Sequence, residues 1–118
     1  MVTPSAATVV LVPFPFSDLS RTKLRPAVVI ADAGRGDWVL CQITSNPYGD
    51  SLSVEITNES FASGSLRIKS YARPGKLFTA NANLIVTEVG TLNTKTFDSI
   101  LEAIVRILTA GLPAAKKS

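Results

Sequence analysis

Two patterns of apolar residues divide this chain, and the change from one to the other limits the folds that it can adopt. Up to about residue 92, apolar residues come in short runs rich in valine, isoleucine and aromatic residues, separated by proline, glycine, asparagine and aspartate. Such runs predict β-strands joined by turns. Beyond residue 92 the apolar residues recur at spacings of three and four, which predicts an amphipathic helix. Because strands and helices do not alternate, we expect a mainly β domain, a small antiparallel barrel or half-barrel with the helix against an open end.

Turn-forming residues place the expected strands. The predicted strands are residues 8–14, 26–31, 38–44, 52–56, 67–71 and 84–89. Pro13 and Pro15 should end the first strand because neither can donate to a strand ladder, and Pro74-Gly75 should break the chain after the fifth. Residues 32–37, with the sequence DAGRGD, predict a hairpin turn. The polar residues 57–65 predict a connection between strands.

The last segment carries the signals that start and stop a helix. Asn93 or Thr94 can cap its beginning, and Gly111 can end it. The apolar stripe expected to pack on the sheet consists of Phe97, Ile100, Leu101, Ile104 and Leu108. We therefore expect one domain over residues 1–118, with residues 1–7 and 112–118 as loose tails.

The composition indicates a soluble globular domain. The chain has 118 residues, 46% of them hydrophobic, and a mean hydropathy of +0.27, which is too apolar for disorder. No apolar run approaches the roughly 18 residues of a membrane span. The first residues lack the basic flank and small-residue cleavage site of a signal peptide, and the lone Cys41 cannot form an internal disulfide, so a cytoplasmic location is expected. Without a histidine to activate it, Cys41 is predicted to be a packed core residue and not a nucleophile.

The net charge of +3 is modest, but the basic residues are clustered. Two windows hold basic residues and no acidic ones: residues 19–31, with Arg21, Lys23 and Arg25, and residues 60–87, with Arg67, Lys69, Arg73 and Lys76. Most surface charges only keep a protein in solution. If both windows lie on one face, however, they would attract a polyanion, because phosphate affinity grows with each neutralised contact. We expect residues 21–23 to form an exposed loop.

Two short motifs suggest where a site is built. Arg25 begins a predicted strand beside Pro26, and this proline restricts the local backbone so that the cation points in a set direction. Thr44 and Ser45 end the next predicted strand, so hydroxyls and guanidinium would share one end of the sheet if the two strands pair antiparallel. This arrangement favours binding of an anion such as a phosphate.

The absence of other motifs narrows the chemistry. With no histidine and one cysteine, the chain has no Ser-His-Asp triad and no zinc site, and it has no glycine-rich nucleotide-binding loop. Arginine, hydroxyls and carboxylates suit the stabilisation of charge on phosphorus. A ribonuclease is possible with this set, because RNA supplies its own nucleophile in the 2′-OH and the protein need only align it and neutralise the phosphorane.

Three blocks of the sequence together resemble a known family. They are VVLVPFPFSDLSRTKLRPAVVI at residues 9–30, VLCQITS at residues 39–45, and LRIKSYARPGKLFTANANLIVTEVGTL at residues 66–92. Over residues 8–108 the chain resembles the MazF/PemK-like toxins of type II toxin–antitoxin pairs. The resemblance implies an SH3-like, CcdB/PemK-type barrel, a homodimer, an antitoxin partner, and metal-independent, cofactor-free cleavage of single-stranded RNA by an mRNA interferase. It also implies that Arg25 and Thr44 are the catalytic residues.

The remaining roles follow from this resemblance. Arg25 would stabilise the charge of the phosphorane, and Thr44 would orient the scissile phosphate or relay a proton. The predicted substrate-binding residues are Ser20, Arg21, Lys23, Ser45, Arg73 and Lys76. The chain departs from the family where Ala7-Thr8 replaces the usual Gly-Asp and where Ser20 stands near the usual loop acid, so the general base is not identified. Asp18 can substitute for this acid, or it can simply form a turn.

Several alternatives stay open at this stage. Arg25 could be a surface arginine paired with Asp32 or Asp37, and Thr44 and Ser45 could simply cap a strand. Tyr71 and Arg73 could grip bases, or Tyr71 could be a packed edge residue. For the whole protein, one alternative is a CcdB-like toxin that binds DNA gyrase without chemistry. The other is a catalytically silent member that only binds RNA or an antitoxin.

Two further expectations concern the substrate and the assembly. Base choice should depend on loop contacts to splayed-out base edges, from residues 17–24 and 46–51. The apolar run at residues 84–89 and Ile107, which lies beyond the main helical stripe, should leave an apolar patch that a two-fold partner covers.

Overall fold

The computed structural model describes residues 4–15 and 22–112. Its strands are β1 (Thr8–Pro15), β2 (Thr22–Gly34), β3 (Asp37–Thr44), β4 (Val54–Ile56), β5 (Phe61–Gly64), β6 (Ser70–Asn81) and β7 (Thr87–Leu92). Its helices are the short 3₁₀ turns η1 (Asn58–Ser60) and η2 (Ala82–Leu84) and the α-helix α1 (Thr94–Thr109). The expected class, mainly β with a C-terminal helix, is confirmed.

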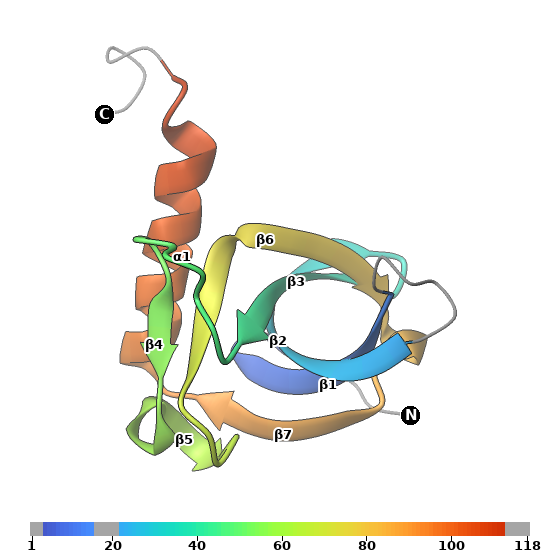
Figure 1. Ribbon diagram of the computed structural model, residues 1–118. Helices are drawn as coiled ribbons and strands as arrows, with labels where there is room; N and C mark the ends of the chain where they lie inside the picture. The colour runs from blue at the N-terminus through green and yellow to red at the C-terminus, as the bar shows by residue number, and fades with distance from the viewer. Residues whose placement is uncertain (1–3, 16–21, 113–118) are drawn as a thin grey trace.

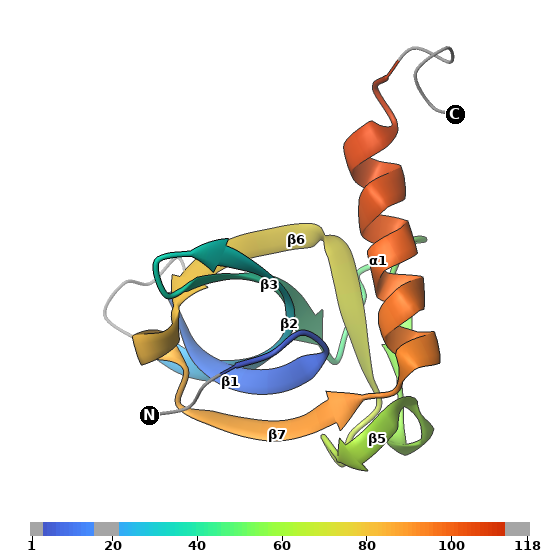
Figure 2. The same cartoon turned by 180° about the vertical axis from the view of Figure 1, so that it is seen from behind.

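The described strands form one antiparallel sheet in the order β4-β6-β3-β2-β1-β7-β5. The sheet curls into a half-barrel, and α1 stands beside it against β6 and β4 (Figures 1 and 2). The short strands β4 and β5 form the two edges of this sheet: among the described strands, β4 pairs only with β6 and β5 pairs only with β7. The predicted half-barrel is therefore present, and the helix lies beside it.

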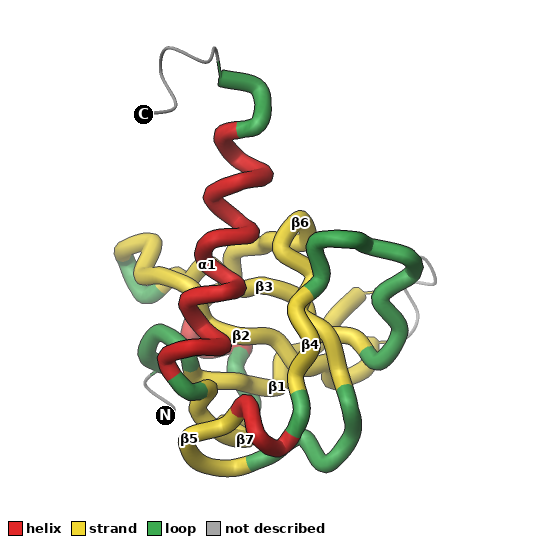
Figure 3. Tube along the Cα trace, turned by 90° about the vertical axis from the view of Figure 1, so that its left-hand side faces the viewer, coloured by secondary structure: helices red, strands yellow, loops and turns green. Residues whose placement is uncertain are grey.

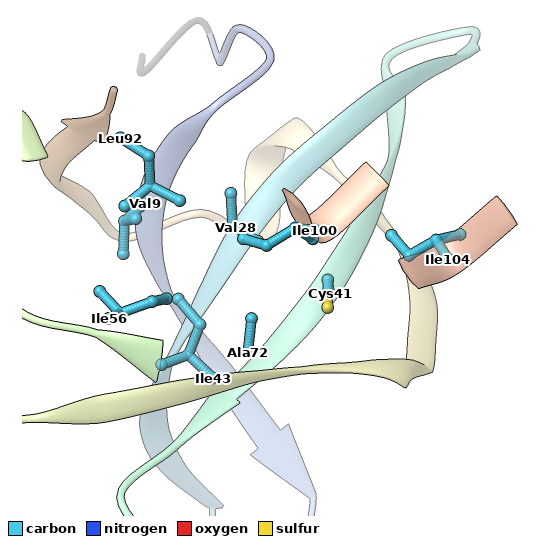
Figure 4. Close-up of a cluster of buried hydrophobic side chains, with 9 residues drawn as sticks. All are labelled: Val9, Val28, Cys41, Ile43, Ile56, Ala72, Leu92, Ile100 and Ile104. Atoms are coloured by element: carbon cyan, nitrogen blue, oxygen red, sulfur yellow. The ribbon is translucent and has the colours of Figure 1, made fainter. Parts of the chain in front are cut away.

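Alternation along the strands gives the sheet two apolar faces. The helix-side core consists of Val9, Val28, Cys41, Ile43, Ile56, Ala72, Leu92, Ile100 and Ile104 (Figure 4). The inner core, on the opposite face and inside the curl, consists of Val10, Val12, Ala27, Val29, Leu40, Ala80 and Ile85. Neighbours in sequence such as Cys41 and Leu40 belong to different cores, because successive side chains of a strand point to opposite faces.

The first strand continues through its prolines, so the prediction that they end it was wrong. Pro13 pairs with Leu24 and Pro15 with Thr22 in the β1–β2 ladder. The N–H of Val86 donates to the carbonyl of Leu11 at 2.9 Å, so the backbone groups of residues 11, 13 and 15 face the β7 side. The β7 ladder stops at Leu11, so the missing N–H groups remove no ladder bond.

The second strand is longer than expected at both ends. It covers Thr22–Gly34 instead of residues 26–31, and Lys23 therefore lies on a paired strand and not in a loop. The predicted hairpin is confirmed, with its turn at Arg35 and Gly36. Both turn residues have left-handed backbones, with φ of 59° and 82°.

The sixth strand crosses the predicted break at Pro74-Gly75. On β3, Cys41 pairs with Leu77 and Ile43 pairs with Ala72, so the six residues 72–77 of β6 are opposite the three residues 41–43 of β3. This bulge bends β6 without ending it, because β3 holds it on both sides of the irregularity. The expected separation into a strand at residues 67–71 and a later piece was therefore wrong.

The sequence-based prediction missed η1 and β5 and gave the wrong bounds for β4 and β7. The expected connection at residues 57–65 contains η1 and β5, and β4 is shorter than predicted. The last strand begins and ends three residues later than expected, and Gly90 lies within it. Gly90 is needed there, because a Cβ would stand 2.5 Å from the carbonyl oxygen of Ser63 on β5.

The helix begins where the sequence predicts and packs with the first part of its apolar stripe. The side chain of Asn93 accepts a hydrogen bond from the N–H of Thr96 at 2.8 Å and so caps α1. Ile100 and Ile104 are buried, whereas Leu108 is 67% exposed because the C-terminal end of α1 projects beyond the sheet (Figure 3). No helix in the described part of the chain is long and apolar enough to cross a membrane.

Residues 4–7 do not form the loose lead-in that was expected. The N–H of Ala7 donates to Val29 and its carbonyl accepts from Leu92, both at 2.9 Å. Pro4 is buried as well. These contacts join the segment to β2 and β7. The other residues of the expected tails lie outside the described part of the chain, except for the exposed Leu112.

Candidate functional site at one end of the half-barrel

Strand register brings the two predicted catalytic residues together. Ala27 of β2 pairs with Gln42 of β3, and this register, continued by two residues, places Arg25 level with Thr44. Residues opposite one another in an antiparallel pair point to the same face. Arg25 and Thr44 therefore lie on the face of the inner core, each two residues beyond the last pair of the β2–β3 ladder, at the end where β3 stops.

Six further side chains share this face and this end. We call the whole set the mouth: Phe14 of β1, Lys23 and Arg25 of β2, Gln42 and Thr44 of β3, and Tyr71, Lys76 and Phe78 of β6. Phe14 is opposite Lys23, and Tyr71 is opposite Thr44. The mouth is thus the polar continuation of the inner core, which fills the rest of the curl.

The guanidinium of Arg25 is held in place. The residue is half-buried and its Nε is fully buried, between Val12 on one neighbouring strand and the end of β3 on the other. Asp32 lies seven residues farther along β2, about 23 Å at the usual strand rise. Asp37 lies beyond it and accepts a hydrogen bond from Asn81 at 3.1 Å. The alternative that Arg25 is a surface arginine paired with Asp32 or Asp37 is therefore wrong.

Thr44 is buried and already makes one hydrogen bond. The residue is 7% exposed. Its Oγ1 accepts a hydrogen bond from the backbone N–H of Asn46 at 3.2 Å. Thr44 therefore caps the end of β3, which was the structural alternative for this residue. The bond fixes the hydroxyl and leaves the hydroxyl proton available to donate, so the cap and a role in the mouth are compatible. Ser45, the next residue, is exposed.

A pocket of about 380 Å³ opens beside this pair. It is lined by Pro13, Phe14, Gln42, Lys76, Leu77 and Phe78. The rings of Phe14 and Phe78 meet edge to face, with centroids 4.7 Å apart. One lining residue, Gln42, belongs to β3, the strand that ends with Thr44. The walls are mainly apolar.

The mouth has a positive electrostatic character. Lys23, Arg25 and Lys76 are cationic, and the side chains that face the mouth from the described parts of β1, β2, β3 and β6 include no carboxylate. Glu55 of β4 is opposite Tyr71, but Lys69 binds it at 3.1 Å. The hydrogen bond to Glu55 raises the pKa of Lys69. The mouth therefore attracts anions.

Arg73 is the predicted substrate-binding residue that the structure separates from this set. Its Nε binds Asp50 at 3.3 Å, and its guanidinium carbon lies 5.5 Å from the centroid of the Tyr48 ring. Both partners belong to the loop between β3 and β4. Arg73 therefore holds that loop against the bulge of β6, and we do not include it among the phosphate-binding residues.

Cys41 has the core role that the sequence predicts. It is completely buried, and its thiol donates to the carbonyl of Arg73 at 3.2 Å. Burial raises the pKa of this thiol to about 12, so it is protonated at neutral pH and is a poor nucleophile. The described residues also contain no cluster of acidic and cysteine side chains suited to a metal ion.

Some predicted site residues lie outside the described chain, and others were missed. Ser20, Arg21 and Asp18 fall within residues 16–21, which the structure does not describe. Gln42 and Phe78 were not predicted at all. The signal that could have found Gln42 is its position two residues before Thr44, which puts both side chains on the same face of a strand.

Comparison with known proteins identifies the family. No curated protein sequence matches the chain. Among solved structures, the MazE–MazF complex of Deinococcus radiodurans is similar with a TM-score of 0.73 and 16% identity, covering 96% of this chain and 100% of that one. An endoribonuclease in complex with its cognate antitoxin, from a mycobacterial species, gives a TM-score of 0.68 and 18% identity, with 94% and 98% covered.

A third structure and a family model complete the comparison. The Mycobacterium tuberculosis toxin MazF-mt6 has a TM-score of 0.66 and 13% identity, and the match covers 86% of this chain and 95% of that toxin. At these identities the likeness establishes the fold. The sequence model of the PemK-like, MazF-like toxins matches residues 6–108, which is most of the chain. The chain therefore belongs to the PemK-like, MazF-like toxin family of type II toxin–antitoxin systems.

Proposed function

We propose that this toxin is an endoribonuclease that cleaves single-stranded RNA without a metal ion. The observation that carries the proposal is the placement of Arg25 and Thr44 level with one another on the inner face, at a cationic end of the half-barrel. Membership of the family supports it, as do similar structures that are named endoribonucleases. The CcdB-like alternative, a gyrase-binding toxin, has no comparable support.

The reaction needs little from the protein besides alignment and charge. The 2′-hydroxyl of the substrate loses its proton to solvent as its oxygen attacks the adjacent phosphorus, the bond to the 5′-oxygen breaks, and this oxygen takes up a proton from solvent. The products carry a 2′,3′-cyclic phosphate and a 5′-hydroxyl. Negative charge gathers on the non-bridging oxygens in the transition state, where the guanidinium of Arg25 stabilises it through two parallel N–H groups. Arginine holds its proton too firmly to act as the acid. Thr44 donates a hydrogen bond from its hydroxyl to a phosphate oxygen and so orients the phosphate.

The neighbouring side chains hold the flanking nucleotides. Lys23 precedes Arg25 by two residues on the same face of β2, and Lys76 lines the pocket from β6; both neutralise adjacent phosphates. Ser45 is exposed next to Thr44 and can donate to another phosphate oxygen. Ser20 and Arg21 also belong to the proposed substrate-binding residues, on the basis of the sequence alone, because they lie outside the described residues.

The partners of the toxin follow from its surface and its family. We propose a homodimer that a cognate antitoxin binds in the cytoplasm. Two apolar patches support two protein contacts: Leu84 and Val86 beside η2, each 52% exposed, and Val105 and Leu108 on the projecting end of α1. The short turn η2, between β6 and β7, and the C-terminal end of α1 lie on opposite sides of the molecule in Figures 1 and 2. A similar structure, an endoribonuclease in complex with its cognate antitoxin, supports the antitoxin partner.

The test compares cleavage and binding at single residues. Purified protein is incubated with a mixed-sequence single-stranded RNA in EDTA, and single-turnover cleavage and RNA affinity are measured. Arg25→Lys keeps the charge but loses the fork, so cleavage should fall about 10²- to 10³-fold, by analogy with an oxyanion donor, while binding changes much less. Thr44→Ala should do likewise. The double mutant should lose less than the product of the two effects, because both act on one phosphate.

Arg35→Lys is the matched control for this experiment. It makes the same replacement at the exposed turn between β2 and β3, away from the mouth, and should cleave at the wild-type rate. Thermal melts confirm that each variant is folded. Equal cleavage by wild type and folded Arg25→Lys would remove Arg25 from the site, and a wild type that binds RNA without cutting it would identify a catalytically silent member of the family.

A further inference from the structure

The pocket beside Arg25 and Thr44 has a polar group that no described residue uses. The carboxamide of Gln42 makes no hydrogen bond to any other residue within the described chain, although the residue is half-buried. A half-buried amide without an internal partner is a group that water or a ligand must satisfy. Gln42 is opposite Ala27, whose small side chain leaves room in front of the amide.

The walls around this amide suit a flat aromatic ligand. Phe14 and Phe78 stand at a near right angle to each other, with 83° between their planes, so one ring can stack on a ligand while the other closes its edge. Pro13 and Leu77 add apolar surface. The volume of about 380 Å³ is at the low end of the range for small-ligand sites, about 300–1,000 Å³. One nucleobase fits such a space, and a folded polymer does not.

The position of the pocket links it to the proposed reaction. Gln42 and Thr44 are separated by one residue on β3 and lie on the same face, about 6.6 Å apart along the strand. This is close to the spacing between neighbouring nucleotides of an extended single strand. Lys76 lies at the pocket as well, where its ammonium group can meet the phosphate that follows the bound base.

We propose that this pocket binds one unpaired base of the RNA next to the scissile phosphate and that Gln42 is the residue that reads its edge. The proposal rests on the proposed function for the identity of the ligand as RNA. It places base selection inside the half-barrel, on strands β1, β3 and β6, in addition to residues 17–24 and 46–51, which the sequence suggests for base choice. A rigid strand holds such a contact more accurately than a loop.

An amide and a carboxylate in this position would select different bases. The amide of Gln42 has one donor and one acceptor, and each of the four bases can offer the complementary pair. A carboxylate only accepts. On its Watson–Crick edge, guanine alone offers two adjacent donors, N1–H and N2–H. Gln42→Glu should therefore shift the preference at one substrate position towards guanine, and Gln42→Leu should flatten that preference by about 5- to 150-fold, the usual value of a bidentate base contact.

The experiment measures base preference twice, by cleavage and by binding. Wild type, Gln42→Leu and Gln42→Glu are given an RNA library randomised around the cleavage site, and the products are sequenced. The same proteins select from a library with 2′-fluoro in place of 2′-hydroxyl groups, which cannot be cleaved by the proposed route. Asn83→Asp is the matched control for the added carboxylate, because Asn83 is exposed in η2, beyond the far end of β6. It should leave both preferences unchanged.

The two readouts separate the two proposals. If wild type cleaves and one position loses its preference in Gln42→Leu and turns towards guanine in Gln42→Glu, both proposals hold. If wild type cleaves and the folded variants keep the wild-type preference at every position, the pocket is not a base site although the enzyme assignment stands. If wild type does not cleave but the variants change the bases selected from the uncleavable library, the pocket stands and the proposed enzyme activity fails. Absence of both cleavage and selection overturns both.

Discussion

The salt dependence of RNA binding provides a quantitative test of the mouth. Three described cations, Lys23, Arg25 and Lys76, face it. Each phosphate contact on a single strand contributes about −0.7 to the slope of log affinity against log salt concentration, so together they should contribute about −2.1. This contribution alone weakens binding roughly 18-fold between 50 and 200 mM salt. Removing one cation should flatten the slope by about 0.7.

The assay is fluorescence anisotropy with a short 2′-fluoro RNA, between 50 and 300 mM KCl. Lys76→Ala should flatten the slope by about 0.7 relative to wild type. Arg35→Asn is the control: it removes the same charge at the opposite end of the β2–β3 hairpin, and asparagine tolerates the left-handed backbone found there, φ 59°. Its slope should equal that of wild type.

Arg73→Ala distinguishes the structure from the sequence-based expectation. The sequence placed Arg73 among the phosphate-binding residues, whereas the structure pairs it with Asp50 at 3.3 Å. The structure therefore predicts an unchanged salt slope for Arg73→Ala, together with a small loss of stability from the released loop. A slope flattened by about 0.7 would return Arg73 to the contact set. If Lys76→Ala and wild type gave the same slope, the reasoning from strand register to phosphate contacts would be refuted.

Three further predictions concern stability and assembly. Burial raises the pKa of Cys41 from 9.0 to about 12, so the stability that the protonated thiol contributes is complete below about pH 9 and is lost as the pH rises towards 12. Urea unfolding should show wild type losing about 2 kcal/mol more than Cys41→Ala between pH 8 and pH 10.5, and parallel losses would contradict the assignment. Gly90→Ala should cost about 1–3 kcal/mol, because its Cβ would meet the Ser63 carbonyl at 2.5 Å, whereas Gly111→Ala, with nothing within 4 Å, should be close to neutral in the same measurement. Sedimentation at tens of micromolar should give about 25 kDa, twice the 12.5 kDa of one chain, and a species of one chain's mass only would argue against the homodimer.

Local sequence patterns predicted the elements whose partners are close or whose signals are strong. The helix was predicted because Asn93 supplies a cap and one stripe of its surface is buried by the sheet. The β2–β3 hairpin was predicted because its turn requires residues that accept a left-handed backbone. Arg25 and Thr44 could be expected at one end because hairpin strands must run antiparallel. The resemblance to a family then gave these two residues their roles.

The errors arose where the neighbouring strand decides the outcome. Pro74-Gly75 typically ends a strand, but β6 pairs with β3 on both sides of it, so the chain forms a bulge there and the strand continues. Pro13 lies in a strand because its backbone faces a side without a partner. The role of Arg73 depends on Asp50, which is 23 residues away in sequence. Gln42 lines a pocket because the curl brings Phe78 of β6 and Phe14 of β1 together beside it. Sequence patterns carry none of these long-range relations.

The alternation of β3 between two faces has a consequence for how this toxin can diverge. Cys41 and Ile43 are completely buried in the helix-side core, while Gln42 and Thr44 turn to the mouth. A mutation at position 42 therefore changes what the mouth contacts and leaves the packing of its two neighbours in place. Selection can explore new targets at such positions while the fold persists. The fold itself is shared at low identity: three solved structures are only 13–18% identical to this chain, with TM-scores of 0.66–0.73.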